Sequence, residues 1–232
     1  MAQMVDGSGL FTGADGKQLA EQRLREDIGQ GALVPGQRLV EADLSERYHV
    51  TRNSARLAID SLASEGLVER IANRGARVRV ISTDEAVTIM QCRRVLDGLL
   101  CADAARHATD ADRGRLVANL DEMRQAVADG ELVRFSQLIQ RHHAFVNGCA
   151  RNATATALVE RLQAQIVRHQ FQLSLRPRRA AQSLAELDRV VTAIVSGDED
   201  EAERAGRDHL QGVIDALLEE AAEGAEGGTA AV

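Results

Sequence analysis

The sequence predicts a mainly α protein, with an N-terminal winged helix-turn-helix whose wing is a small β-hairpin and a C-terminal all-α helical bundle. Three observations lead to this prediction. Two short helical patterns separated by a tight turn precede Gly66. A stretch in which apolar and polar residues alternate follows them. From Thr83 onward the apolar residues recur at helical spacing, and no strand pattern is present after Ile81.

Composition divides the chain of 232 residues into four segments. Residues 1–15 are rich in Gly and Asp, and residues 222–232 are small, acidic and rich in Gly, so we expect both ends to be disordered. Between them we expect the winged helix-turn-helix DNA-binding domain over 16–82. A helical effector-binding and dimerisation domain is expected over 83–221.

The N-terminal domain is expected to begin with a helix over about 17–29. A second helix covers about 41–48 and ends at His49, one of the few non-Gly residue types that tolerate a positive φ angle. A third helix starts after Thr51, whose hydroxyl is suited to capping it. Two short helices joined by such a turn are typical of a helix-turn-helix.

The predicted wing consists of two alternating strands, Leu67–Ile71 and Ala76–Ile81, joined by a turn at residues 72–75. The alternation directs Val78 and Val80 inward and Arg77 and Arg79 outward.

The C-terminal domain is expected to start at Ser82, where a hydroxyl precedes two carboxylates in the first turn of a helix. Polar residues, Gly and Pro separate the helical patterns that follow. The predicted helices are approximately 84–107, 110–128, 131–150, 153–175, 180–196 and 199–221.

Composition excludes several classes of protein. No run of 18 apolar residues is present, so no membrane span is expected, and the N-terminus lacks the pattern of a secretory signal. The three cysteines are far apart and odd in number, which favours reduced, buried thiols and a cytoplasmic location. Aromatic residues make up only 2% of the chain, so it lacks the stacking platforms of proteins that bind single-stranded nucleic acid.

Charge in the N-terminal domain is balanced, but its distribution indicates a DNA-binding face. Residues Ala55, Ala58, Ile59 and Leu62 form the apolar stripe of the third helix. The opposite side carries Arg52, Asn53, Arg56 and Asp60, next to Thr51 at the start of the helix. Two arginines one turn apart suit contacts to phosphates and to base edges in the major groove.

At the tip of the predicted wing, Arg74 and Gly75 are placed to enter a minor groove, where narrow segments attract arginine. For any single arginine, an ordinary solvated surface is an equally good interpretation. Their joint placement on a helix-turn-helix and its wing favours binding to double-stranded DNA.

The residues from Gly31 to Val80 resemble the winged helix-turn-helix of GntR-superfamily transcriptional regulators. The matching pieces are GALVPGQRLVEADLSERYHVTRNSAR and LASEGLVERIANRGARV. The resemblance implies that Arg52 and Arg56 contact the operator, that Thr51 and Asn53 assist at its backbone or base edges, and that Gly75 shapes the wing. The chain departs from the family pattern at Ala42, Ser54, Ala55 and Leu57, so the operator sequence does not carry over.

The helical half resembles the effector domain of the FadR subfamily, called FCD, in its shorter VanR-like form with six helices. Many relatives hold a divalent metal in this domain through one Asp and three His. Here His143 and His209 match two of these ligands, but Ile139 and Leu187 replace the others. We therefore expect no metal and no other cofactor. A weak metal site and ordinary core histidines remain alternatives to an organic-ligand pocket.

The resemblance also places Arg93 at the cavity of this domain, and His169 and Arg168 lie where they could point into it. Cationic donors beside the apolar Ile139 and Leu187 suit a small carboxylate with a hydrophobic part. The predicted ligand-binding residues are Arg93, His143, His209 and His169.

These observations predict a ligand-responsive transcriptional regulator and not an enzyme. It is expected to act as a repressor and to bind a palindromic operator as a homodimer. The alternative is a metal-dependent enzyme or a metal-sensing helical protein that uses the C-terminal bundle. The common metalloprotease, nucleophile-elbow and phosphate-loop motifs are absent from the sequence.

Overall fold

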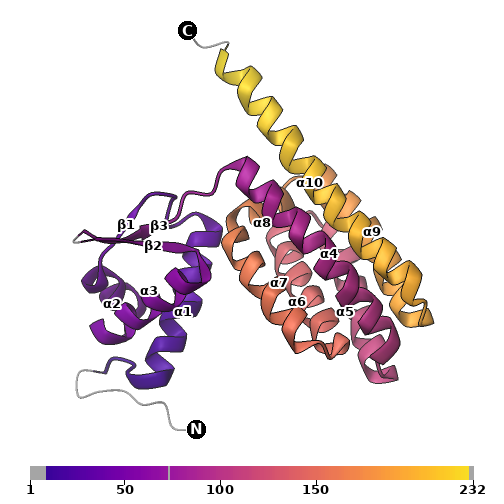
Figure 1. The fold of residues 1–232 in the computed structure, drawn as a ribbon, viewed down its shortest axis with the longest axis horizontal. Coiled ribbons are helices and arrows are strands. Elements are labelled where there is room, and N and C mark those ends of the chain that lie inside the picture. The colour runs from indigo at the N-terminus through magenta and orange to yellow at the C-terminus, as the bar shows by residue number, and fades with distance from the viewer. Residues whose placement is uncertain (1–8, 73, 230–232) are drawn as a thin grey trace. The chain divides into compact units, whose positions relative to one another are not determined.

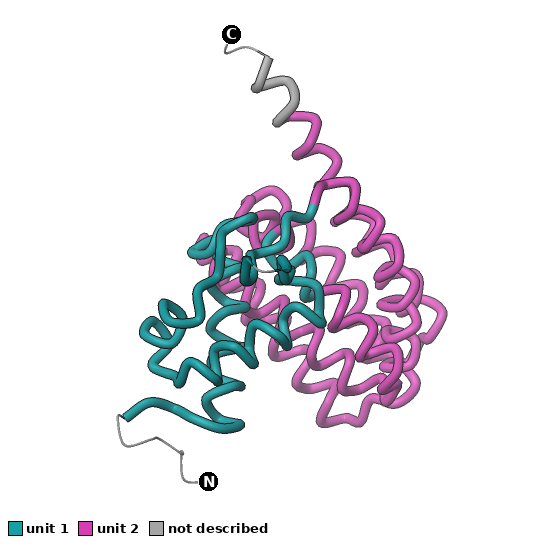
Figure 2. The backbone as a smooth tube through the Cα atoms, turned by 60° about the vertical axis from the view of Figure 1, so that its left-hand side comes forward, with its two compact units in different colours: residues 1–81, 164–168 teal, residues 82–163, 169–232 magenta. Residues whose placement is uncertain are grey.

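The computed structural model describes residues 9–72 and 74–229, and the side chains within these ranges up to residue 223. The described residues form two compact units (Figure 2). The first contains the residues up to Ile81 together with Ala164–Arg168. The second contains Ser82–Gln163 and the residues from His169 onward.

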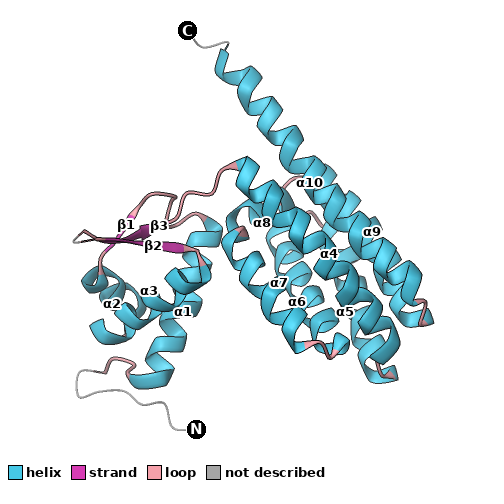
Figure 3. Cartoon of the chain, in the orientation of Figure 1, coloured by secondary structure: helices cyan, strands magenta, loops and turns pink. Residues whose placement is uncertain are grey.

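The first unit contains three helices and a small sheet, as predicted (Figure 3). The helices pack on one another, α1 against both α2 and α3, and α2 against α3. They are α1 (Gly13–Gln30), α2 (Glu41–Tyr48) and α3 (Arg52–Glu65).

The structured part of the chain begins earlier than predicted, before residue 15. Phe11 pairs with Val50 in an isolated parallel bridge. The Phe11 N–H donates to the His49 carbonyl and the Thr51 N–H donates to the Phe11 carbonyl, both at 3.0 Å. The expectation of disorder is therefore wrong for residues 9–15, because backbone pairing with a distant segment fixes them. Residues 1–8 lie outside the described residues.

The sheet contains a strand that the sequence did not predict. Strands β2 (Val68–Ile71) and β3 (Gly75–Val78) form the wing, and the two-residue strand β1 (Arg38–Leu39) pairs with the other side of β3. All pairs are antiparallel, in the order β1-β3-β2. Two residues are too short for a recognisable alternation, so only the pairing with β3 defines β1.

The alternation predicted for β3 extends too far. Val78 is buried as expected, but Val80 is 58% exposed, so its inward placement is wrong. The strand ends at Val78, and the strict alternation of faces ends with it.

The core of the first unit includes Leu24 of α1 and Ile59 and Leu62 of α3, all at most 1% exposed. Tyr48, the single tyrosine of the chain, is buried at the end of α2 and donates a 2.7 Å hydrogen bond to Asp27 of α1. Burial, followed by this hydrogen bond, raises the Tyr48 pKa above its ordinary value, so the phenol stays protonated and keeps α1 and α2 joined.

The described residues of the second unit form helices joined by short loops, with no strand (Figure 1). Helices α4, α5, α6, α9 and α10 pack on one another as a bundle. The helices are α4 (Thr83–His107), α5 (Asp110–Ala128), α6 (Leu132–Ala150), α7 (Ala153–Gln165), α8 (Val167–Ser174), α9 (Pro177–Ser196) and α10 (Glu199–Thr229).

Between α6 and α10, the helices differ from the prediction in two places. The segment 153–175 is interrupted at Ile166, so it forms α7 and α8 instead of one helix. Helix α9 begins at Pro177, three residues earlier than predicted, because proline is tolerated in the first turn of a helix. The predicted cap at Ser82 is confirmed, since its hydroxyl accepts a hydrogen bond from the Glu85 N–H at 3.2 Å.

Helix α10 runs beside α4 and α9 and continues to Thr229 (Figure 1). The helix predicted over 199–221 therefore ends eight residues too early, and the expected disorder of the tail stays a prediction. Ala and Glu, both strong helix formers, dominate the segment that follows Leu218, and this outweighs its glycines. An ion pair of 3.0 Å between Arg176 and Glu220 anchors the preceding turn.

The bundle core consists of aliphatic side chains and one fully buried aromatic ring. Phe135, Leu116, Met123 and Ile194 are all 0% exposed. Among the described residues, no helix is long and apolar enough to cross a membrane.

Candidate DNA-binding face and ligand cavity

The turn between α2 and α3 has the predicted geometry. His49 lies in the left-handed region, with φ 55° and ψ 44°. The Val50 N–H donates to the Ser45 carbonyl at 3.1 Å, which closes the turn. Thr51 caps α3, because its hydroxyl accepts a hydrogen bond from the Ser54 N–H at 3.2 Å. The turn and the cap together fix the point where α3 begins.

The two sides of α3 differ as predicted. Its apolar stripe is buried, whereas Arg52, Asn53, Arg56 and Asp60 are exposed. The Arg56 guanidinium donates a 2.7 Å hydrogen bond to the Asn53 side-chain carbonyl. This bond orients Arg56 along the exposed face without neutralising its charge, because Asn53 is uncharged.

The tip of the wing carries Arg74 and Gly75, both exposed. Gly75 has φ +87°, a conformation that favours glycine and that lets the chain return along β3. The Arg74 N–H donates to the Ile71 carbonyl at 3.0 Å, which closes the turn. Asn73, which precedes them in the turn, is outside the described residues.

Two ion pairs stabilise the wing, one with α3 and one between its own strands, and sequence reasoning missed both. Arg70 of β2 contacts a carboxylate oxygen of Asp60 on α3 with two nitrogens, at 2.9 and 2.5 Å. Arg77 of β3 contacts Glu69 of β2 at 2.5 Å. The first pair joins the wing to α3, and the second joins the two strands.

The second unit contains a small cavity between α4, α6, α9 and α10. The space that a water-sized sphere can occupy is about 10 Å³, enough for a single water molecule. His143 and His209, which the sequence predicted as ligand-binding residues, both line the cavity, and their ring centroids lie 5.9 Å apart. The lining residues are Asp97, Cys101, His142, His143, Val146, Asn147, Leu187, Val190, Gly206, His209 and Leu210.

Burial keeps two of these imidazoles uncharged. Burial, followed by the charge of His209, lowers the pKa of His142 to about 3. Burial and the nearby charge of Arg93 hold the pKa of His143 well below its ordinary value. Nδ1 of His142 is buried without a hydrogen-bond partner. A buried nitrogen without a partner indicates a place that a water or a ligand would satisfy.

His209 is held by a carboxylate outside the cavity. Its Nδ1 lies 2.8 Å from Glu186 on α9, and because a carboxylate only accepts, this nitrogen carries the proton. Two guanidinium nitrogens of Arg179 donate hydrogen bonds to the same carboxylate, at 2.7 and 2.6 Å. Burial opposes the ionisation of Glu186, but the hydrogen bonds and charges of His209 and Arg179 together bring its pKa below the ordinary value.

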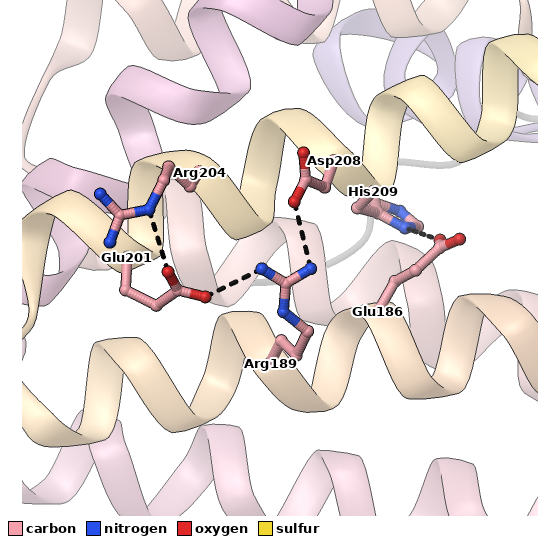
Figure 4. A network of polar contacts seen from close by, with 6 residues as sticks. All are labelled: Glu186, Arg189, Glu201, Arg204, Asp208 and His209. Atoms are coloured by element: carbon pink, nitrogen blue, oxygen red, sulfur yellow. Dashed lines mark hydrogen bonds and ion pairs between the residues drawn. The ribbon is translucent and has the colours of Figure 1, made fainter.

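Figure 4 shows a second connection between the same two helices, next to His209. Arg189 of α9 contacts Glu201 at 2.9 Å and Asp208 at 3.1 Å, both on α10. Together with the Glu186–His209 contact, these bonds fix the register of α9 against α10.

Arg93 is fully buried on α4 and pairs with Asp97 one turn later, at 3.0 and 3.1 Å. Asp97 lines the cavity, but Arg93 is not among the lining residues. The Nη1 atom of Arg93 is buried without a hydrogen-bond partner. The Nη2 atom is also without a hydrogen bond, although it lies 3.0 Å from the Asp97 carboxylate in the ion pair.

Comparison with known proteins identifies the two units. The model described as "Bacterial regulatory proteins, gntR family" matches residues 17–78, and the model "FCD domain" matches residues 88–212, more than half of the chain. The chain belongs to the GntR family. It is a DNA-binding transcriptional regulator of the GntR/FCD type.

Curated relatives of this GntR regulator are transcriptional regulators too. The HTH-type transcriptional repressor RspR of Escherichia coli K12 is 27% identical over 194 residues, which cover 84% of this chain and 85% of RspR. The HTH-type transcriptional regulator LutR of Bacillus subtilis is 26% identical over 212 residues, which cover 82% of this chain and 95% of LutR.

Solved structures share the fold. Escherichia coli McbR/YncC has a TM-score of 0.79 at 18% identity, over 94% of this chain and 99% of that chain. A GntR regulator from Rhodococcus sp. RHA1 has a TM-score of 0.69 at 22% identity, over 87% of this chain and 97% of that chain. The matching families and curated relatives are transcriptional regulators and not enzymes, so the enzyme alternative is not favoured.

The metal site implied by the family resemblance does not fit the residues present. Within the described part of the chain, no group of three or more His, Cys, Asp or Glu could hold a metal ion. Leu187 lines the cavity where a ligand is expected, and Ile139 packs against the bundle core. An aliphatic side chain provides no lone pair, so His143 and His209 lack the third protein ligand that durable sites use.

The structure brings together only some of the predicted ligand-binding residues. His143 and His209 line the cavity, whereas Arg93 and His169 do not. Sequence reasoning missed Asp97 and Glu186. The four-residue spacing of Arg93 and Asp97 could have revealed that these two residues pair on one face of α4. The contact between Glu186 and His209 could not have been found, because it joins residues on two different helices.

Proposed function

We propose that this GntR regulator is a repressor that binds a palindromic operator as a homodimer and releases it when a small organic effector occupies the helical unit. The observation that carries the DNA contact is the capped start of α3, where Arg52 and Arg56 are exposed on a helix whose opposite face is buried. Such a helix places its N-terminal side chains at base edges in the major groove.

Each predicted DNA contact has a specific role in this proposal. Arg52 and Arg56 would bind phosphates or base edges, with Asn53 holding Arg56 in position. Thr51 caps the helix and would bring its start close to the backbone. Arg74 would enter the adjacent minor groove from a tip that Gly75 allows to turn.

The homodimer follows from how such proteins read DNA. A single recognition helix covers only a few base pairs, so two copies related by a two-fold axis would read half-sites about one helical turn apart. Repression is supported by the name of the relative RspR, a transcriptional repressor.

The effector would be a small organic acid that enters the cavity of the FCD domain. The apolar wall formed by Val146, Leu187 and Val190 would hold its hydrophobic part. Nη1 of Arg93 and Nδ1 of His142 are buried polar atoms whose hydrogen bonds a ligand could complete. Because the cavity admits about one water, the acid would have to widen it, and that movement would couple binding to the DNA-binding unit.

The DNA-binding proposal is tested by replacing both Arg52 and Arg56 with Ala. The operator would first be selected from a library of random duplexes with the wild-type protein, and binding would then be followed by fluorescence anisotropy. We expect the double variant to lose sequence-specific binding, because each arginine contributes about 1–3 kcal/mol. Its thermal stability should not change, because both side chains are exposed.

The matched control is Arg204→Ala, which removes an exposed arginine of α10. It should bind the operator as tightly as the wild type. Equal losses in the control and the double variant would contradict the proposal.

The effector proposal is tested by thermal shift with a panel of small carboxylic acids and their uncharged amides. A matching acid should raise the melting temperature of the full chain and release the selected operator, whereas its amide should do neither. The same acid should have no effect on a His143→Leu variant. An amide that acts as well as the acid would contradict the carboxylate assignment.

A further inference from the structure

A groove in the first unit lies between the unpredicted strand β1, the start of α2, the recognition helix α3 and the wing. Its volume is about 320 Å³. Arg38 and Leu39 line it from β1, Arg52 and Ile59 from α3, and Gly75 from the wing. The groove therefore adjoins two residues of the proposed DNA contact, Arg52 and Gly75.

Three arginines line the groove, but they differ in whether their charge is already neutralised. Arg70 is engaged by Asp60 through two nitrogens. Arg38 and Arg52 are both exposed, and no ion pair or side-chain hydrogen bond joins either one to another described residue. Glu41 is the one carboxylate among the described lining residues. The groove is therefore lined by two arginines that no described residue engages.

Strand pairing explains why Arg38 is uncommitted. In the register of the sheet Arg38 lies opposite Arg77, and Arg77 lies opposite Glu69 on the next strand. Residues in register share one face of a sheet, so this face carries a row of two arginines and one glutamate. Glu69 contacts Arg77 at 2.5 Å, which leaves the Arg38 charge unmatched at the sheet edge.

We propose that Arg38, exposed and unpaired at the sheet edge that borders this groove, is a further DNA contact and binds a backbone phosphate of the operator. The inference rests on the proposed DNA-binding function. Guanidinium groups suit phosphate oxygens because their planar donors match the geometry of the anion. A backbone contact of this kind would help to set the depth and register of α3 in the major groove.

The test measures how DNA binding depends on salt in Arg38→Ala. A phosphate contact is independent of sequence, so a labelled duplex of arbitrary sequence serves as the probe. The slope of log K against log salt should become less steep by about 0.9 for each phosphate that the variant no longer binds. Affinity at low salt should fall by about threefold to thirtyfold. The fold should survive, because only the exposed side chain of Arg38 is removed.

Arg77→Ala is the matched control. It removes an exposed arginine at the neighbouring position of the same sheet, but one that Glu69 already engages. Its salt slope should stay close to that of the wild type. If the salt slope changed equally in Arg38→Ala and Arg77→Ala, the loss of one positive charge would explain both results, and the proposal would be overturned.

Glu41→Gln provides the opposite change. Removing the carboxylate that lines the groove should tighten binding severalfold at low salt, and weaker binding would overturn the proposal. An unchanged slope in Arg38→Ala, with normal wild-type binding, would refute the role of Arg38 alone. Failure of the wild type to bind any duplex would instead refute the DNA-binding proposal together with this one.

Discussion

The exposed face of α3 and the surroundings of the cavity in the second unit each carry an arginine, but in opposite environments. Arg52 on α3 is exposed and has no partner among the described side chains. Arg93 on α4 is 0% exposed and is paired with Asp97. An exposed charge contributes little to stability and remains free to bind an anion, whereas a buried charge must be compensated within the fold. The environment of each arginine therefore determines its role.

The largest expected effect comes from breaking the buried pair. Asp97→Ala leaves the Arg93 guanidinium buried and without its counter-charge, and should lower the free energy of unfolding by about 3–5 kcal/mol. Urea denaturation followed by circular dichroism would measure it. The matched change in the first unit, Asp60→Ala, removes the partner of exposed Arg70 and should cost about 0–1 kcal/mol. Similar losses in both variants would refute the contrast between the two environments.

The next largest change in stability is expected from substitutions that alter the packing around the cavity. A Cβ at Gly206 of α10 would lie 2.7 Å from Sγ of Cys101, so Gly206→Ala should destabilise by about 1–3 kcal/mol. Adding Cys101→Ala should recover part of the loss. Gly114 on α5 has no atom within 4 Å of its Cβ position, so Gly114→Ala should stabilise by about 0.5–1 kcal/mol. The melting temperatures of the three variants would measure these changes in stability. If Gly206→Ala raised the melting temperature, the prediction that Gly206 is tightly packed against Cys101 would be contradicted.

The smallest expected effect is a dependence of stability on pH that arises in the cavity. His142 stays uncharged in the fold because burial lowers its pKa to about 3, whereas the unfolded residue titrates near 6.5. As the pH falls below about 6.5, the unfolded state gains protons that the folded state does not, so stability decreases. Between about pH 7.5 and about pH 5.5 we expect His142 to account for a loss of about 1.4 kcal/mol.

His142→Gln should remove this part of the pH dependence, because glutamine does not titrate in this range. The exposed histidine in the helix-turn-helix provides the control, since His49→Asn keeps a residue that tolerates a positive φ angle. Urea denaturation at the two pH values would measure both variants. An unchanged pH dependence in His142→Gln would refute the assignment.

Local sequence signals were sufficient to predict most of the structure of the DNA-binding unit. The cap at Thr51, the left-handed His49 and the buried stripe of α3 are all confirmed. These features depend on residues within one turn of one another, and the chemistry that fixes them is present in the local sequence. For the same reason, most helix boundaries in the bundle were predicted to within one residue, Thr83–His107 and Asp110–Ala128 among them.

The parts of the fold that the sequence failed to predict depend on pairing between distant segments and not on local signals. Strand β1 exists only because it pairs with β3, and residues 9–15 are ordered because Phe11 pairs with Val50. In both cases the partner is distant in the chain, and a segment of a few residues carries no periodicity of its own.

The sequence by itself determined the fold class, the helix-turn-helix and the family, because hydrophobic spacing and caps are local and the motif residues are contiguous. Only the tertiary structure decided which charges are free and which are paired. It placed Asp97 against Arg93 and Glu186 against His209, and it left Arg38 and Arg52 without a partner at the edge of an open groove. The physical reason is that the state of a charged side chain depends on burial and on partners from other elements, and these contacts exist only in the folded chain.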